Sequence, residues 1–299
     1  CRMPQYGSTG GHRNDLSIFF QHHTERTQVE LFDGQGQRAV LVIAADDVTV
    51  RGLDVARTGV SNIEDRAGIR VREAANCRIV HNRLRDNLFG IYLQRASGCV
   101  IADNDIAAHG DGQSTSGNGI HMWYSPNTTV EHNRVSGHRD GIYFEFSSGG
   151  MTRGNTSEHS QRYGLHFMFS DSCRYETNTF RDNNSGVAVM YSRGIAIQHN
   201  RFERSLGGAA YGLLLKEILG GDVSDNVFIG NSTGLYLEGS SHLMVRDNDF
   251  LSNGWAAKVL ASAMDNEFTG NRFAGNAFDV STNSRAANSI FDRNWWDAY

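Results

Sequence analysis

Soft metal-binding side chains recur at related positions in the middle of this chain. His166 and Met168 lie two residues apart, and Met190 follows Met168 after 22 residues. An imidazole combined with methionine thioethers is a ligand set that suits soft Cu(I). His121 and Glu145 stand at corresponding positions in the preceding repeats and are flanking candidates. These residue types predict a copper contact if the fold brings the five side chains to one surface.

Aromatic side chains accompany these candidates. Tyr92, Trp123 and Tyr143 occupy the same two positions of other repeats, and Tyr191 comes directly after Met190. A solvated sheet face would carry Thr, Ser, Lys and Glu instead, so we expect an exposed apolar patch here. Such patches usually contact a partner or a ligand. We therefore predict that these four residues bind a partner protein.

Short alternating segments would hold all of these side chains in place. Each segment begins at a glycine, for which we expect a turn with positive φ. The residues first and third after the glycine should point inward, and the second and fourth outward. The segments begin at Gly90, Gly141, Gly164, Gly186 and Gly234.

Regularly spaced asparagines predict how the segments stack. Ten of them recur with a period near 22 residues, which is typical of a solenoid whose coils bury their apolar faces against one another. We predict an all-β, right-handed parallel β-helix of about ten coils of about 22 residues, with amide hydrogen bonds between stacked asparagines. The ladder consists of Asn82, Asn104, Asn133, Asn155, Asn178, Asn200, Asn226, Asn248, Asn271 and Asn294.

The repeat also suggests the domain organisation. It fades toward the N-terminus, which separates a poorly assigned segment, 1–37, from a β-helix domain, 38–299. Three longer connections, 56–67, 107–118 and 205–211, all fall between the asparagine position and the following glycine. We expect them to project from one corner and to border the outward columns, where loops on a rigid scaffold often carry function.

Composition excludes several partners. The formal net charge of −5 argues against nucleic acid. No apolar run approaches the roughly 18 residues that a membrane span needs, so we expect no transmembrane segment.

Three cysteines, Cys77, Cys99 and Cys173, each stand five residues before a ladder asparagine. This position predicts buried thiols in the core. Cys77 and Cys99 fall on adjacent coils, where a disulfide bond is geometrically possible but not required.

An enzymatic alternative comes from the fold class itself. Parallel β-helices often act on uronate polymers as lyases or epimerases, which need a general base and a group that neutralises the carboxylate. His121, Tyr143 and His166 could serve as acid and base. The outward columns lack an adjacent carboxylate pair, and the chain has no calcium-binding nonapeptide repeat.

Several motifs resemble one known family. They are 86–94 (DNLFGIYLQ), 116–125 (SGNGIHMWYS), 138–146 (HRDGIYFEF), 162–171 (RYGLHFMFSD), 185–191 (SGVAVMY), 211–217 (YGLLLKE) and 294–297 (NWWD). Together they are similar to the NosD family, the periplasmic β-helix accessory proteins of nitrous oxide reductase maturation. The resemblance runs from about residue 34 to the end of the chain.

This resemblance implies a non-enzymatic, periplasmic protein that handles copper. Its implied partners are nitrous oxide reductase, an ABC-type ATPase and permease, and a copper-chaperone lipoprotein. The resemblance assigns no metal ligand. Residues before 34, including Phe19–His23, do not match the family pattern, no signal peptide is visible, and family members are expected to continue beyond Tyr299.

Overall fold

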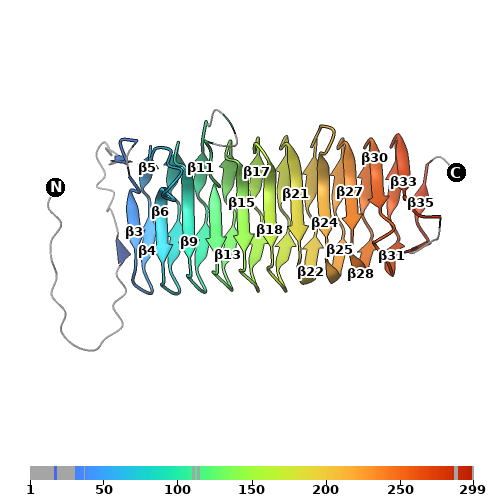
Figure 1. The fold of residues 1–299 in the computed structure, drawn as a ribbon, viewed down its shortest axis with the longest axis horizontal. Coiled ribbons are helices and arrows are strands. Elements are labelled where there is room, and N and C mark those ends of the chain that lie inside the picture. Colours follow the sequence, from blue (N-terminus) through green and yellow to red (C-terminus); the bar gives the residue numbers. More distant parts are fainter. Residues whose placement is uncertain are drawn as a thin grey trace.

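A computed structural model describes residues 17–18, 31–36, 38–109, 112, 115–285 and 289–297. Within these residues all regular structure is β-strand, and every strand pair is parallel. Three sheets wind around a common axis as an elongated solenoid (Figure 1). The predicted all-β parallel β-helix is confirmed, with about eleven coils.

The three sheets are named A, B and C in the order in which each coil visits them. Sheet A contains β1 (Ser17–Ile18), β4 (Thr49–Arg51), β7 (Arg78–Val80), β10 (Val100–Ala102), β13 (Thr129–Glu131), β16 (Met151–Arg153), β19 (Arg174–Glu176), β22 (Arg193–Gln198), β25 (Leu219–Ser224), β28 (Ser241–Arg246), β31 (Asn266–Thr269) and β34 (Ser289–Asp292).

Sheet B contains β2 (Leu31–Asp33), β5 (Asp54–Ala56), β8 (Arg83–Arg85), β11 (Asp105–Ala107), β14 (Arg134–Ser136), β17 (Thr156–Glu158), β20 (Thr179–Arg181), β23 (Arg201–Glu203), β26 (Val227–Ile229), β29 (Asp249–Leu251), β32 (Arg272–Ala274) and β35 (Trp295–Trp296). Sheet C contains β3 (Leu41–Ile43), β6 (Ala67–Arg72), β9 (Phe89–Gln94), β12 (Ile120–Trp123), β15 (Asp140–Glu145), β18 (Tyr163–Met168), β21 (Ser185–Met190), β24 (Tyr211–Lys216), β27 (Thr233–Glu238), β30 (Trp255–Val259) and β33 (Phe278–Ser281).

Strands at the N-terminal end pair before the predicted domain boundary at residue 38. β1 pairs with β4, and β2 pairs with β5. The segment Phe19–His23, which does not match the family pattern, lies outside the described part of the chain. The division of the chain into 1–37 and 38–299 stays a prediction.

The asparagine ladder runs without a break along the corner between sheets A and B. Each Asn Nδ2 donates to the Oδ1 of the next asparagine, at 2.9–3.1 Å, from Asn82 to Asn294. The same Oδ1 also accepts the backbone N–H of the previous asparagine, as between Asn155 and Asn178 at 3.0 Å. The ladder therefore satisfies buried polar groups that the tight corner would otherwise leave unpaired.

The core is a stack of equivalent side chains from successive coils. Two residues after the ladder position, Phe180, Phe202, Phe228, Phe250 and Phe273 are buried, and their rings stack at 4.7–5.6 Å between centroids. Since the pairing is in register, each ring covers the one in the coil before it. This stacking gives the outer faces a rigid support.

Glycines at the start of the sheet C strands have a different role from the predicted one. Gly90 and Gly141 do not adopt positive φ. A Cβ at Gly90 would lie 2.5 Å from the Gly119 carbonyl oxygen, and one at Gly141 would lie 2.0 Å from Ser157 Oγ. The prediction of positive φ is therefore wrong. Glycine is required at these positions because neighbouring backbone and side-chain atoms leave no room for a Cβ.

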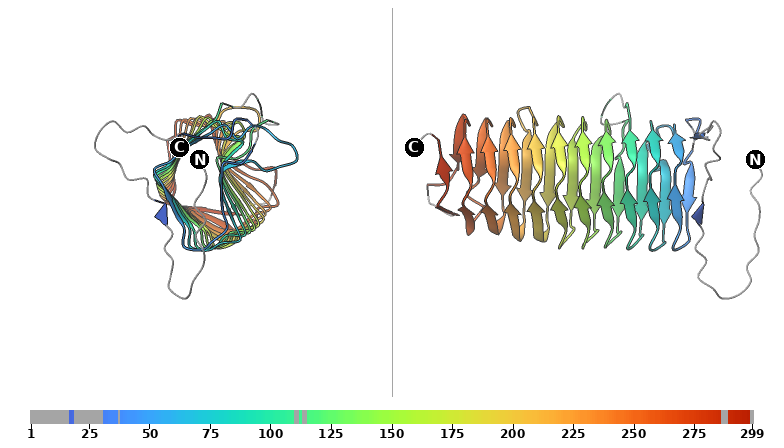
Figure 2. Two further views of the ribbon diagram at one scale, coloured as in Figure 1. Left: turned by 90° about the vertical axis from the view of Figure 1, so that its left-hand side faces the viewer. Right: turned by 180° about the vertical axis from the view of Figure 1, so that it is seen from behind.

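The three long connections leave the solenoid at one corner. They join β5 to β6, β11 to β12 and β23 to β24, so each lies between sheet B and sheet C. In the view along the axis the projecting loops gather on the same side of the solenoid (Figure 2). This is the corner that the residue spacing predicts, and it lies next to the start of the sheet C strands.

Candidate functional site: the outer face of sheet C

Strand pairing assembles the two predicted outward columns on sheet C. His121 pairs with Tyr143, which pairs with His166 in the next coil. In the second column, Glu145 pairs with Met168, and Met168 pairs with Met190. We call these the His/Tyr column and the Met column. The full His/Tyr column is Tyr92, His121, Tyr143, His166, Ala188, Leu214 and Tyr236, and the Met column is Gln94, Trp123, Glu145, Met168, Met190, Lys216 and Glu238.

The two columns differ in exposure, which the alternating pattern does not predict. Tyr92, Tyr143 and His166 point away from the core, yet they are only 5%, 9% and 4% exposed. Phe89 packs against Tyr92 with a ring separation of 5.4 Å, and Tyr163 packs against His166 at 4.8 Å. Large neighbours on the same face therefore cover the His/Tyr column. The expectation of a fully exposed patch is wrong for these three residues, while the Met column remains partly exposed.

Rings of the His/Tyr column form one continuous row. Ring centroids are 4.6 Å apart between Tyr92 and His121, 4.8 Å between His121 and Tyr143, and 4.9 Å between Tyr143 and His166. Asn118 Nδ2 lies 3.1 Å from His121 Nδ1, and burial lowers the pKa of His121 to about 3. His121 is consequently neutral at physiological pH. One of its two ring nitrogens is engaged by the Asn118 side-chain amide.

His166 lies beside a buried carboxylate. Its Nδ1 is 3.2 Å from Arg162 Nη2 and 3.8 Å from Asp140 Oδ2. Burial opposes ionisation of Asp140, but the His166 and Arg162 side chains outweigh it and lower the pKa of Asp140 to about 2. The other ring nitrogen of His166, Nε2, is buried and has no hydrogen-bond partner within the described part of the chain. Buried polar atoms are normally paired, so this nitrogen is available for a ligand.

The two methionines are direct neighbours on adjacent strands. Met168 and Met190 are each partly exposed, and the Tyr143 hydroxyl donates to Met168 Sδ at 3.5 Å. Glu145 borders Met168 in the preceding coil, and the ion pair between Lys216 and Glu238, at 2.8 Å, closes the column on the other side. The fold thus places His166, Met168, Met190 and Glu145 on adjoining positions of one face.

His121 is separated from His166 by one coil, which Tyr143 occupies. Across the described residues, no group of three or more His, Cys, Asp or Glu side chains is arranged to hold a metal ion. A site on this face would therefore depend on the thioethers, which exclude hard cations and favour a soft ion.

An exposed aromatic row beside the Met column was only partly predicted. Tyr124, Phe146, Phe169 and Tyr191 stack along the corner that follows sheet C, with ring centroids 4.8–5.1 Å apart. They are 37–46% exposed, and all four adopt positive φ between 47° and 55°. We call this row the aromatic corner. The recurring aromatic residue directly after the Met-column position could have revealed it, but only Tyr191 is among the predicted docking residues.

The backbone of the aromatic corner is held by a serine ladder. Ser125 N–H donates to Ser147 Oγ at 2.9 Å, Ser147 N–H to Ser170 Oγ at 2.9 Å, and Ser170 N–H to Ser192 Oγ at 3.0 Å. Bulky residues with positive φ are uncommon and cost free energy, so four in a row suggest a role for the exposed rings.

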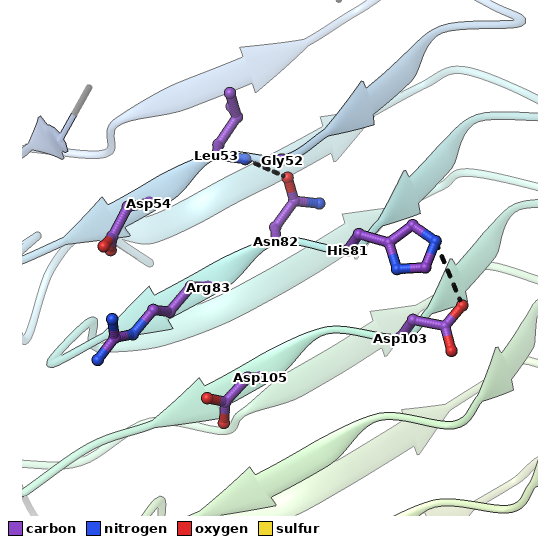
Figure 3. Close-up of a pocket in the computed structure, with 8 residues that line it drawn as sticks. All are labelled: Gly52, Leu53, Asp54, His81, Asn82, Arg83, Asp103 and Asp105. Carbon is purple, nitrogen blue, oxygen red and sulfur yellow. Dashed lines mark hydrogen bonds and ion pairs between the residues drawn. The ribbon is translucent and has the colours of Figure 1, made fainter. Parts of the chain in front are cut away.

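A hollow lies on the surface near the start of the asparagine ladder. It is an open cavity of about 440 Å³ whose wall includes His81, Asn82, Arg83 and Asp103. Figure 3 shows Asn82 turned toward the Leu53 backbone and His81 facing Asp103, at 3.7 Å. His81, like His132 and His199, lies on the outer surface. Exposed ion pairs of this kind contribute little stability, and the hollow has no apolar wall comparable to the sheet C face.

Comparison with known proteins places this fold in a family. Residues 106–297 match the family model described as "Periplasmic copper-binding protein (NosD)". The chain belongs to the NosD family. The matched region contains the Met column from Trp123 onward and the whole aromatic corner.

Two curated relatives agree with this assignment. A protein of Stutzerimonas stutzeri named "Probable ABC transporter binding protein NosD" is 29% identical over 84% of this chain, and one of the same name from Pseudomonas aeruginosa is 30% identical over 83%. The chain spans about 60% of the length of these NosD relatives. Both are named as binding proteins, in agreement with the prediction of a non-enzymatic role.

Solved structures support the fold. A double mutant of the periplasmic alginate epimerase AlgG superimposes with a TM-score of 0.69 and 14% identity, covering 89% of this chain and 74% of that one. At this identity the likeness extends to the β-helix alone. No helix in the described part of the chain is long and apolar enough to cross a membrane.

Proposed function

We propose that this NosD-family chain is a non-enzymatic periplasmic accessory protein for copper-site assembly in nitrous oxide reductase. The description of the family as periplasmic and copper-binding supports this role, and so does the ABC-transporter name of the relatives. The observation that carries the proposal is the pairing of Met168 with Met190 beside the unpartnered Nε2 of His166. In this role copper is cargo that the protein holds and passes on.

His166, Met168 and Met190 form the proposed copper contact, with Glu145 and His121 as flanking groups. The two thioethers suit Cu(I), and one imidazole adds a stronger donor without a net charge. Burial keeps His121 neutral, so this flanking group adds no charge beside the copper contact. Partial exposure of both methionines allows a partner to deliver and remove the ion.

Anaerobic Cu(I) titration against a chromophoric competitor tests this contact. We expect the native chain to withdraw Cu(I) from the competitor, and Met168→Leu/Met190→Leu to do so much more weakly. Leucine keeps the apolar volume, and both side chains point away from the core, so the unfolding transition should stay unchanged. Equal competition by the native and double-variant chains would show that copper does not bind at these thioethers.

Partner docking is the second part of the proposal. The initial candidates for this contact are Tyr92, Trp123, Tyr143 and Tyr191. Tyr92 and Tyr143 are buried, so they support the exposed side chains from beneath the surface. Trp123 packs against Tyr124 with a ring separation of 4.8 Å, and Tyr191 belongs to the aromatic corner. The exposed rings of this corner offer a partner a large apolar contact at low entropic cost. The proposed partners are the reductase, the copper-chaperone lipoprotein and the ATPase–permease pair.

Serine replacements in the aromatic corner separate docking from copper binding. Phe146→Ser/Phe169→Ser should lower the yield of copper-loaded reductase in a maturation assay, while the Cu(I) titration of the purified chain stays native. A matched control is Met244→Ser, which alters an exposed apolar residue on sheet A, away from this face. Normal maturation with the double variant would remove the aromatic corner from the docking surface.

A further inference from the structure

Two cysteine side chains occupy matching positions in consecutive coils at the N-terminal end of the solenoid. Val100 N–H donates to the Cys77 carbonyl oxygen at 2.9 Å, which fixes Cys77 and Cys99 in the same register. Both side chains point into the core, with exposures of 0% and 1%. Coils stacked by parallel pairing lie about 4.8 Å apart, and disulfides span Cα separations of roughly 4.4–6.8 Å. The backbone therefore meets the main geometric requirement for a disulfide bond without moving.

The third buried cysteine provides an internal comparison. Cys173 holds the equivalent position farther along the solenoid, where Gly150 and Ile195 are its neighbours in the adjoining coils. Among the described residues it has no thiol beside it, and burial raises its pKa to about 11. Cys173 should therefore be inert, whereas Cys77 and Cys99 face one another.

The local environment of the pair favours reaction between the two sulfurs. Cys77 Sγ lies 3.4 Å from the Ala45 carbonyl oxygen, and Cys99 Sγ lies 3.6 Å from that of Ser97. A hydrogen bond from the Cys99 thiol lowers the pKa of Cys77, and the same contact raises the pKa of Cys99. Cys77 is thus the member of the pair that more readily becomes a thiolate, the nucleophilic form of cysteine.

We propose that Cys77 and Cys99 are joined by an intercoil disulfide bond when the chain matures in an oxidising compartment. The assumption of an oxidising compartment rests on the periplasmic location in the proposed function. The geometric argument does not depend on it. The Cys77 thiolate attacks one sulfur of an external disulfide and releases one thiol, forming a mixed disulfide. The Cys99 thiolate then attacks the Cys77 sulfur and releases the second thiol, so that one disulfide replaces another and the two protons leave with the released thiols.

This bond would stabilise the N-terminal part of the solenoid. It ties together two coils near the end of the solenoid, where a stack of coils is most prone to fray. Because both sulfurs are buried, exchange must occur before the coils close or during local opening.

Mass spectrometry after denaturation and alkylation tests the bond. The full chain is recovered once from an oxidising compartment and once from a reducing cytoplasm. We expect the first sample to contain a linked pair of peptides with Cys77 and Cys99, a mass lower by two hydrogens, and a fully alkylated Cys173. Purified reduced chain incubated with oxidised glutathione in mild denaturant should form the same link on refolding, whatever its natural location.

Two alanine variants serve as a matched pair. Reductant should lower the unfolding temperature of the native chain and of Cys173→Ala, and should not change that of Cys99→Ala. Free alkylation of both Cys77 and Cys99 in chain from the oxidising compartment would overturn the proposal, as would a link from either residue to another cysteine. Neither result would affect the Cu(I) titration at the Met column, so the two proposals fail separately.

Discussion

Asn178→Ala is expected to lower the free energy of unfolding by about 3–5 kcal/mol, because it breaks the asparagine ladder in the middle of the solenoid. Asn178 is fully buried. Its Oδ1 accepts both the backbone N–H and the Nδ2 of Asn155, each at 3.0 Å. Its Nδ2 donates to the Thr152 carbonyl oxygen and to Asn200 Oδ1, both at 2.9 Å. Alanine removes the side-chain partner of the buried Asn155 N–H and of the Thr152 carbonyl oxygen, and each buried group left unpaired costs roughly 1–3 kcal/mol.

Urea unfolding followed by circular dichroism measures this effect, with two further variants as controls. Asn184→Ala changes an exposed asparagine in the same coil and should alter stability by no more than about 0.5 kcal/mol. Asn294→Ala removes the half-buried end of the ladder and should fall between the two. A change below about 1 kcal/mol for Asn178→Ala would show that water or a shifted backbone replaces the lost amide.

The backbone path of this protein could be predicted because its repeat is set by buried polar groups that have few other hydrogen-bond partners. A buried amide that bonds the same amide one coil later must recur at every coil, so its spacing in the chain equals the coil length. The outward columns follow from the period of two in each strand, and the register of Tyr143 with His166 agrees with it.

Burial on the outer face could not be predicted in the same way. Whether His166 is covered depends on the size and direction of side chains from other positions, such as Tyr163 and Arg162, and no periodicity encodes this. The same reason hid the role of Asp140, which in the sequence resembles an ordinary turn residue beside a glycine. In the folded chain it is fully buried and lies 3.8 Å from the His166 ring.

Three of the four residues of the aromatic corner were missed for a conformational reason. Phe146 and Phe169 stand where the chain leaves sheet C, and both adopt a left-handed conformation that glycine or asparagine usually takes. A sequence pattern that expects small residues at such corners passes over large ones. The recurrence of an aromatic residue after the Met-column position is visible in the sequence, but the ring contacts and the serine ladder beneath them are formed only by the stacking of successive coils.

Asp140→Asn is expected to weaken Cu(I) binding by about 10–100-fold, the usual cost of removing a carboxylate behind a metal-binding histidine. Arg162 Nη2 lies 3.2 Å from His166 Nδ1. Copper at Nε2 requires the ring hydrogen to be on Nδ1. The Asp140 carboxylate, whose Oδ2 lies 3.8 Å from Nδ1, can stabilise that N–H. Asparagine keeps the shape of the side chain and loses the charge, which makes Asp140 a positioning residue.

Asp182→Asn is the matched control. Asp182 accepts two hydrogen bonds from Arg204, at 2.7 Å each, as Asp140 does from Arg162. In the described part of the chain, no histidine is hydrogen-bonded to Asp182. It should leave Cu(I) affinity unchanged. Nitrogen NMR of His166 adds a readout that a purely structural role would not change: copper should place the hydrogen on Nδ1 in the native chain and do so incompletely in Asp140→Asn. Native affinity together with a native ring signal in Asp140→Asn would mean that the carboxylate only anchors Arg162, and that His166 binds copper without help from this carboxylate.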